Sequence, residues 1–160
     1  MCRIICFVIL LLVVSCGAGD DDGSSKQSVM VGLYGVDAPG QVIVRIASLN
    51  LSIDDNASPV MLSGGDIDLG DEESEWMVAT FDLHDGAESV VFELGFHRDG
   101  QIEIDGEMRP LDLSGPPVSF VADAASVRER KHILIEINLA GSIVEGDESV
   151  FLLPDFRVRY

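Results

Sequence analysis

The segment Asp66–Glu75 holds six carboxylates within ten residues, which makes it the first candidate for binding chemistry. Calcium takes about six to eight oxygen ligands, and flexible acidic loops supply them. Alternation along an extended chain places Asp66 and Asp68 on one side, with Asp71 three residues further on. The order departs from an EF-hand loop, because Gly70 falls one position early. Two interpretations stay open: a calcium site at Asp66, Asp68 and Asp71, or an acidic surface loop that keeps an edge strand soluble.

No residue pattern in the sequence predicts catalysis. The sequence has no GxSxG, SxxK, HExxH, Walker or GxGxxG motif. Its three histidines, His84, His97 and His132, have no metal-ligand spacing to one another. We therefore predict a protein that is not an enzyme, with no catalytic residues and no cofactor except the calcium considered above.

The charge is strongly acidic, with 10 Lys and Arg against 28 Asp and Glu and a formal net charge of −18. Binding to nucleic acid requires basic side chains that neutralise phosphates, so this balance excludes a nucleic-acid partner. An acidic surface fits solubility, association with cations, or a basic partner.

The N-terminal residues suggest export. The apolar run from Ile4 to Val14 is shorter than the roughly 17 to 25 residues of a membrane-spanning helix, and its flanks match a secretory signal. It ends in Val13-Val14-Ser15-Cys16, which resembles the lipobox of bacterial lipoproteins, although that family prefers Leu where Val13 stands. The resemblance implies cleavage before Cys16 and lipidation of its thiol. The alternative is an ordinary secretory signal cut after Ala18.

This resemblance also predicts the organisation and location of the chain. Residues 1–15 are expected to be a lipoprotein signal peptide, residues 16–28 a lipidated cysteine with a flexible acidic Gly/Ser linker, and residues 29–160 one folded domain. The lipid anchor makes the membrane of the cell envelope a partner. Gly17 replaces the Asp that often marks inner-membrane retention, so we expect the outer membrane, with the side of exposure open.

The folded part shows strand periodicity throughout, which predicts an all-β, single antiparallel β-sandwich of about nine strands. Asp85-Gly86, Asp99-Gly100 and Asp105-Gly106 are typical hairpin turns and predict a meander over residues 75–113. A switch of apolar parity predicts a bulge near Ala47-Ser48. One helical turn is considered for residues 139–145. The expected strands are residues 28–35, 41–52, 75–83, 89–97, 101–105, 107–113, 118–122, 132–139, and 149–153 continued as 156–160 beyond Pro154.

Three landmarks also resemble an exported, often lipid-anchored bacterial family of unknown function. They are Asp37-Ala38-Pro39, the Ile102–Gly106 hairpin, and Ser142-Ile143-Val144 followed by the Phe151–Arg159 region. The resemblance spans about residues 29–160 and implies export and a β-sandwich, but it brings no catalytic residues. The acidic segment, defined here as Asp66–Glu75, departs from the family.

These observations favour a lipid-anchored envelope protein that acts as a non-enzymatic interaction or structural module, with an unidentified protein or glycan partner. The alternative is a calcium- or glycan-binding, adhesin-like domain.

Overall fold

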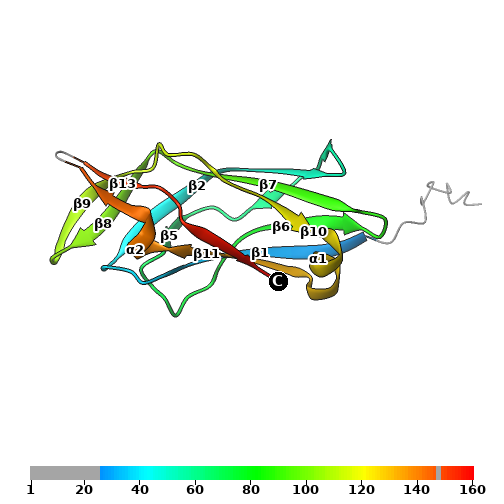
Figure 1. Ribbon diagram of the computed structural model, residues 1–160, viewed down its shortest axis with the longest axis horizontal. Coiled ribbons are helices and arrows are strands. Elements are labelled where there is room, and N and C mark those ends of the chain that lie inside the picture. Colours follow the sequence, from blue (N-terminus) through cyan, green and yellow to red (C-terminus); the bar gives the residue numbers. More distant parts are fainter. Residues whose placement is uncertain (1–25, 147–148) are drawn as a thin grey trace, which may run out of the picture.

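The structure is a computed structural model that describes residues 26–146 and 149–160. The predicted signal peptide, Cys16 and most of the predicted linker lie outside these residues. Two β-sheets pack face to face, so the predicted all-β sandwich is confirmed (Figure 1). Within the described ranges, no helix is long and apolar enough to cross a bilayer.

The first sheet has five strands, with β1 at its centre. β1 runs parallel to β11 on one side and antiparallel to β6 on the other. The expectation of a purely antiparallel sandwich is therefore wrong. The order across the sheet is β14 (Phe156–Arg159), β11 (His132–Asn138), β1 (Lys26–Val36), β6 (Trp76–His84) and β4 (Met61–Leu62).

The second sheet has nine strands, of which β2 is the longest. A bulge between Ile46 and Ser48 interrupts β2, which confirms the predicted parity switch. The bulge lies where β2 changes its partner from β8 to β7. The order is β10 (Val118–Asp123), β7 (Ser89–Phe96), β2 (Val42–Ile53), β8 (Asp99–Ile104), β9 (Glu107–Asp112), β13 (Val150–Leu152) and β12 (Ile143–Glu145), while β3 (Asn56–Ala57) and β5 (Asp66–Asp68) also pair with β2.

The predicted meander is wrong except for its last hairpin. Asp105 and Gly106 have φ of 54° and 81° and join β8 to β9, as an Asp-Gly hairpin turn requires. Asp85-Gly86 instead connects β6 in one sheet to β7 in the other. Asp99-Gly100 lies inside β8, paired with β9. The expected count of strands is also low, since β3, β4, β5 and β12 are only two or three residues long.

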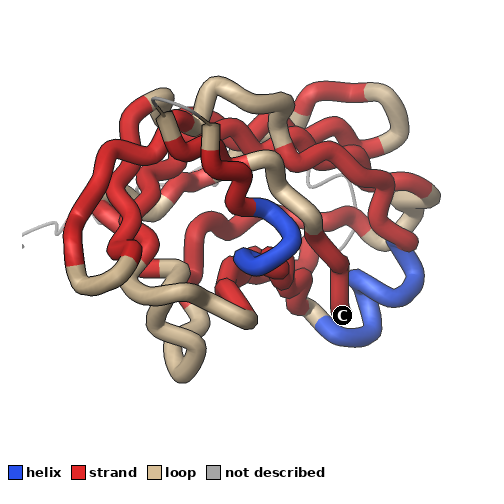
Figure 2. Tube along the Cα trace, turned by 60° about the vertical axis from the view of Figure 1, so that its left-hand side comes forward, coloured by secondary structure: helices blue, strands red, loops and turns tan. Residues whose placement is uncertain are grey.

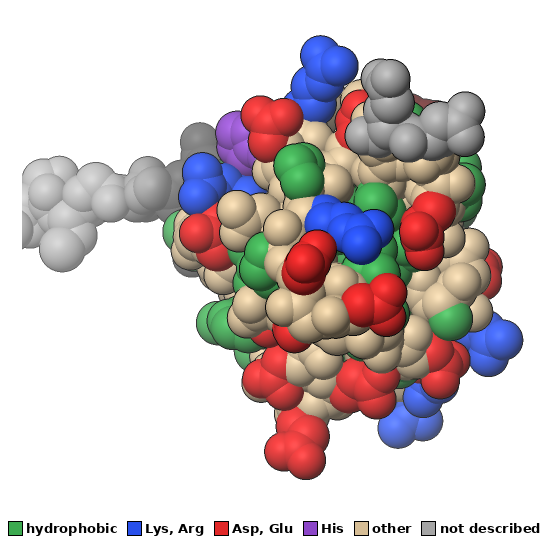
Figure 3. Space-filling model, turned by 90° about the vertical axis from the view of Figure 1, so that its left-hand side faces the viewer, with side chains coloured by type: hydrophobic (Ala, Val, Ile, Leu, Met, Phe, Trp, Pro, Cys, Tyr) green, Lys and Arg blue, Asp and Glu red, His purple; other side chains and the backbone are tan. Residues whose placement is uncertain are grey.

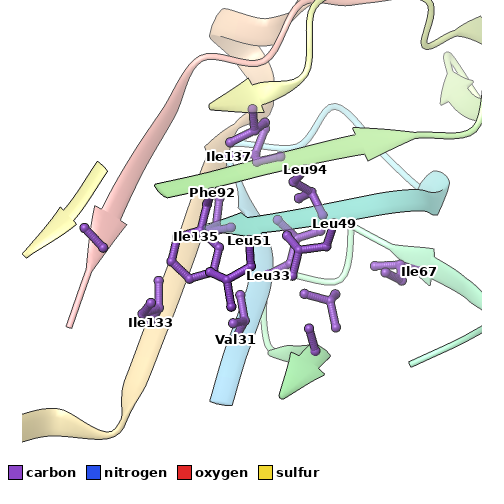
Figure 4. Packing of buried hydrophobic residues seen from close by; sticks show 14 of the residues in the cluster. Val31, Leu33, Leu49, Leu51, Ile67, Phe92, Leu94, Ile133, Ile135 and Ile137 are labelled. Atoms are coloured by element: carbon purple, nitrogen blue, oxygen red, sulfur yellow. The ribbon is translucent and has the colours of Figure 1, made fainter. Parts of the chain in front are cut away.

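Alternating side chains of both sheets form one core between them. β1 contributes Val31 and Leu33, and β11 contributes its three isoleucines from the same sheet. Figure 4 shows these side chains meeting Leu49, Leu51, Phe92 and Leu94 of the second sheet. Burial of this apolar surface is the main stabilising term of the fold.

Two short helices complete the described chain (Figure 2). α1 (Ala124–Arg130) was not expected, because seven residues are too few for a clear amphipathic pattern. Its N-cap is Asp123, whose carboxylate accepts a hydrogen bond from the backbone N–H of Ser126. α2 (Leu139–Ser142) is the helical turn considered for residues 139–145, and it leads directly into β12.

The sandwich has two distinct ends. Lys26 begins β1 at the end that also carries α1 and the β6–β7 connection (Figure 1). The β8–β9 hairpin and the β12–β13 pair lie at the opposite end. The predicted linker therefore joins the fold at the end remote from these two hairpins.

Candidate functional site

The acidic segment was the strongest sequence candidate, and each of its three proposed calcium ligands binds other groups of the chain. Asp66 forms an exposed ion pair with Arg45, its cross-strand neighbour on β2, with Oδ1 2.5 Å from Nη2. Asp71 accepts a hydrogen bond of 2.6 Å from the hydroxyl of Ser74 and closes a local turn. Their carboxylates therefore serve different parts of the surface.

Asp68 is the most heavily engaged of the three. Its Oδ1 accepts hydrogen bonds from the backbone N–H groups of Val42 at 3.0 Å and Gly70 at 2.9 Å. Its Oδ2 accepts a third bond, from the side chain of Gln41 at 3.0 Å. The backbone carbonyl of Asp68 also accepts the indole N–H of Trp76. This residue anchors β5 and the following turn to the start of β2.

The structure consequently does not bring Asp66, Asp68 and Asp71 together as ligands of one ion. Across residues 26–146 and 149–160, no group of three or more His, Cys, Asp or Glu side chains is arranged to hold a metal. Ile67 between the two aspartates is buried in the core, which fits the predicted alternation of this stretch. The local geometry is that of a carboxylate-braced edge strand and turn.

A second polar cluster lies on the outer face of the five-stranded sheet, around Glu136 of β11. This glutamate is only 6% exposed, although it points away from the core. The hydroxyl of Tyr34 donates a hydrogen bond to it, and Arg159 of β14 forms an ion pair with it. Burial raises the pKa of Tyr34, and the hydrogen bond and negative charge of Glu136 raise it further.

A third cluster, beside the second, joins β11 to the residue before β6. Nε2 of His132 lies 2.8 Å from Oε1 of Glu75. The Glu75 side chain passes over Gly32 of β1, where a Cβ atom would stand only 2.6 Å from that oxygen. Glycine at this position therefore leaves room for a carboxylate to cross the central strand. His84 stands elsewhere, 3.8 Å from Asp54.

A large hollow lies at the end of the sandwich that carries the two hairpins. It has a volume of about 640 Å³ and opens between β8–β9 and the β12–β13 pair. Arg98, Arg109, Asp99, Asp112 and Glu145 are among its lining residues. Figure 3 looks at this end, where basic and acidic side chains stand side by side. Such mixed charge suits a polar partner surface better than an apolar ligand.

One carboxylate in this hollow, that of Asp112, has a lowered pKa. Hydrogen bonds from the side chain and backbone N–H of Ser114 lower the pKa of Asp112, and the charge of Arg98 lowers it further. Asp112 is therefore held as a carboxylate, which makes it an acceptor rather than a proton donor at neutral pH.

Sequence reasoning missed the Glu136 cluster and could not have found it. The alternation of β11 marks Glu136 as outward-facing, and that is correct. Its burial depends on Tyr34, which is 102 residues earlier in the chain and reaches it only through the parallel pairing of β1 with β11. Strand periodicity carries no information about such a partner.

Comparison with known proteins gives no match: no family model matches the chain, and no curated protein or solved structure is significantly similar to it. The likeness to bacterial lipoproteins therefore rests on the first sixteen residues, and the likeness to an exported family on its three short landmarks. Both stay predictions.

Proposed function

We propose that this chain is a lipid-anchored protein of the bacterial envelope, in which a β-sandwich acts as a non-enzymatic interaction or structural module. Lipidation at Cys16 and a linker that ends before Lys26, the first residue of β1, attach the sandwich to the membrane. The proposal draws on the resemblance of Val13–Cys16 to a lipobox and on the acidic, Gly-rich residues that follow it. More than one acyl chain gives a stable anchor, which a single chain does not.

The polarity of the fold is the observation that carries this proposal. The described chain begins with Lys26 at one end, and the hollow lined by Arg98 and Arg109 lies at the other. A linker attached before Lys26 therefore leaves the hairpin end facing away from the membrane. We infer that this end meets the partner, a protein or glycan with polar groups of both signs. Gly17 follows Cys16 in place of the Asp that often marks inner-membrane retention, so we place the anchor in the outer membrane.

The calcium-binding alternative has less support from the geometry. A carboxylate has about four acceptor positions, and Asp68 already uses three of them for hydrogen bonds, so little capacity is left for an ion. The adhesin-like alternative with a glycan ligand uses the same exposed end, so a glycan is one class of partner within the proposal. It is distinguished from a protein partner by binding to purified surface polysaccharide.

The test of anchoring compares Cys16→Ala with Cys6→Ala in cells that express the full, epitope-tagged chain. We expect the wild type and Cys6→Ala to sediment with the membranes and to incorporate labelled fatty acid. Cys16→Ala should lose the label and leave the outer-membrane fraction. If Cys16→Ala keeps both the label and the membrane association, the lipid-anchor proposal is wrong.

Protease treatment of the same intact cells then tests which side of the membrane the sandwich occupies. Digestion of the anchored wild type places the hairpin end outside the cell and makes external surfaces its partners. Protection, with digestion only after permeabilisation, places it in the periplasm and makes envelope components its partners.

A further inference from the structure

Methionine is absent from the core of the described sandwich and present on its surface. The buried hydrophobic side chains of the described residues are those of Val, Leu, Ile, Ala and Phe. Met30, Met61, Met77 and Met108 are instead 49%, 76%, 55% and 47% exposed, and the fifth methionine, Met1, lies outside the described residues. Methionine is among the residues most often buried, because its flexible side chain fills irregular gaps. This fold therefore keeps its thioethers out of the interior.

The strand register explains why two of these methionines lie on the outer face of the first sheet. The neighbours of Met30 on β1, Val29 and Val31, are fully buried, so alternation turns Met30 away from the core. Met61 on β4 and Met30 are both opposite Thr80 of β6. Residues opposite one another point to the same face of a sheet, so Met61 shares the outer face with Met30.

The other two methionines are also separated from the core. Met77 on β6 is exposed, whereas the next residue, Val78, is buried. Met108 lies on β9 beside Glu107, which is exposed as well. The interior is therefore filled by other residues, and a chemical change at any of these sulfur atoms acts on the hydrated surface rather than on core packing.

The thioethers are the most accessible readily oxidised groups of the sandwich. No cysteine occurs after Cys16, so the described residues contain no thiol. The single tryptophan, Trp76, is half-buried, and its indole N–H donates a hydrogen bond of 3.0 Å to the backbone carbonyl of Asp68. Thioether sulfur is soft and polarizable, and its conversion to the sulfoxide is a common oxidative change in proteins.

We propose that the sandwich consumes hypochlorous acid by oxidation of Met30, Met61, Met77 and Met108 to methionine sulfoxide, while the fold stays intact. In each reaction a sulfur–oxygen bond forms and the oxygen–chlorine bond of the acid breaks. The sulfur loses two electrons, and chloride and a proton are released. This activity goes beyond the anchored interaction module. It uses only residues of the described sandwich and stands whether or not Cys16 carries a lipid.

Exposure of the thioethers makes this oxidation tolerable and reversible. A sulfoxide is polar, so it disrupts a core but is hydrated at an exposed position. Methionine sulfoxide reductases, one for each sulfoxide epimer, restore the thioether. In that reaction the sulfoxide oxygen leaves as water, and a dithiol is oxidised to a disulfide. The same four side chains can therefore react with oxidant again.

The first test measures how fast each methionine reacts in the folded chain. The full chain is prepared in detergent with Cys2, Cys6 and Cys16 replaced by serine, so that no thiol consumes the oxidant. Limiting hypochlorous acid is added, and peptide mapping by mass spectrometry locates each added oxygen atom. We expect all four described methionines to react, at rates that rise less than about threefold when urea unfolds the chain, because exposed thioethers gain little access.

Leu94→Met is the matched control, because Leu94 is fully buried in the core. Methionine nearly conserves the volume of leucine, so the variant should fold. The thioether at position 94 should react about tenfold or more slowly than that of Met61 in the folded chain, since the oxidant reaches it only when the core opens. In urea the two thioethers should react alike.

The second test measures tolerance and consumption. The oxidised chain should keep its far-UV circular dichroism and a melting temperature within about 3 °C of the unoxidised chain, as expected for surface changes. Both reductases with dithiothreitol should restore the original mass. A variant with all four methionines replaced by leucine should leave an added N-acetylmethionine reporter oxidised about twofold or more than the parent does, because fewer thioethers compete for the acid.

Three results would overturn the proposal. The first is that the four methionines react only after urea is added, or that the thioether of Leu94→Met reacts as fast as that of Met61 in the folded chain. The second is that the oxidised chain loses its cooperative melting transition. The third is that the parent and the fourfold variant leave the reporter equally oxidised. If the fourfold variant does not melt cooperatively, the four single variants replace it in the same competition.

Discussion

The acidic segment and the hairpin end of the sandwich both gather charged side chains, and they differ in what those side chains already contact. In the acidic segment, Asp68 accepts three hydrogen bonds and Asp66 pairs with Arg45. At the hairpin end, Arg98, Arg109 and Glu145 line an open hollow, and Asp112 accepts a hydrogen bond from the backbone N–H of Ser114. A dense run of carboxylates in a sequence can therefore serve the fold itself, as the contacts of Asp68 show.

The largest effect is expected from Gly35→Ala, which tests whether the acidic segment is docked rigidly on the first sheet. A Cβ at Gly35 would stand 2.1 Å from the carbonyl oxygen of Leu69. This oxygen belongs to the backbone, so it cannot rotate away as a flexible side chain could. We expect a loss of about 3 kcal/mol in the free energy of unfolding, typical of overpacking. Urea denaturation measures it.

The matched control for Gly35→Ala lies just before the acidic segment. A Cβ at Gly64 would meet no other atom within 4 Å, so Gly64→Ala should change the unfolding free energy little. Equal losses in the two variants would show that the segment does not pack against Gly35 as described.

Asp68→Ala tests whether the carboxylates of the acidic segment are structural. Removing its side chain leaves the N–H groups of Val42 and Gly70 without their acceptor, so we expect a loss of about 2 kcal/mol. Asp66→Ala removes an exposed ion pair and should cost under about 1 kcal/mol. A larger loss for Asp66→Ala than for Asp68→Ala contradicts this assignment.

Arg159→Ala tests the polar cluster around Glu136 on the outer face of the five-stranded sheet. The variant leaves Glu136 buried with Tyr34 as its partner, but Arg159 is itself 59% exposed, so the expected loss is about 1 kcal/mol. Arg157→Ala is the control, because Arg157 is opposite Glu136 in the register and forms no ion pair with it. Thermal unfolding of the two variants should therefore differ.

The smallest effect is expected on how the stability of the fold changes in acid. Hydrogen bonds from the backbone N–H groups of Ser89 and Glu88 lower the pKa of Asp54, and His84 lowers it further. A carboxylate with a lowered pKa in the folded state stabilises it above the unfolded pKa of about 3.9, and this contribution is lost as the pH falls below that value. Asp54→Asn should therefore show a smaller drop in urea midpoint between pH 5 and pH 2.5 than the wild type.

The neighbouring variant Asp55→Asn controls for the change of net charge in this acid titration. Asp55 stands next to Asp54 in the same exposed turn but does not accept those two backbone hydrogen bonds. It should leave the acid dependence close to that of the wild type. An identical profile for both variants would argue against a specific role of Asp54.

Features set by neighbouring residues were predictable from the sequence, and those set by distant ones were not. The Asp105-Gly106 hairpin needs two adjacent residues with positive φ, and the bulge in β2 shows as a change of apolar parity. Asp85-Gly86 carries the same local signal as a hairpin, yet it connects the two sheets. Alternation looks identical in a hairpin and in a crossover, because both strands bury one face in the same core.

The candidate sites also differ in whether neighbouring or distant residues form them. The acidic segment was visible as a run of carboxylates, but two of the three donors to Asp68, Gln41 and Val42, lie 27 and 26 residues away. The hollow at the hairpin end was not recognised, since its lining residues come from β8, β9, β12 and β13 and meet only through the pairing of these strands. No spacing along the chain expresses that arrangement.

The central place of β1 has a mechanical consequence. The strand begins at Lys26, where the proposed tether joins the fold, and it pairs with β11 on one side and β6 on the other. A pull on the tether along β1 loads both rows of hydrogen bonds in shear, so they must fail together rather than open one at a time. Resistance to such force depends on the barrier to unfolding rather than on equilibrium stability. Force applied through such a tether therefore acts first on the central strand of the first sheet.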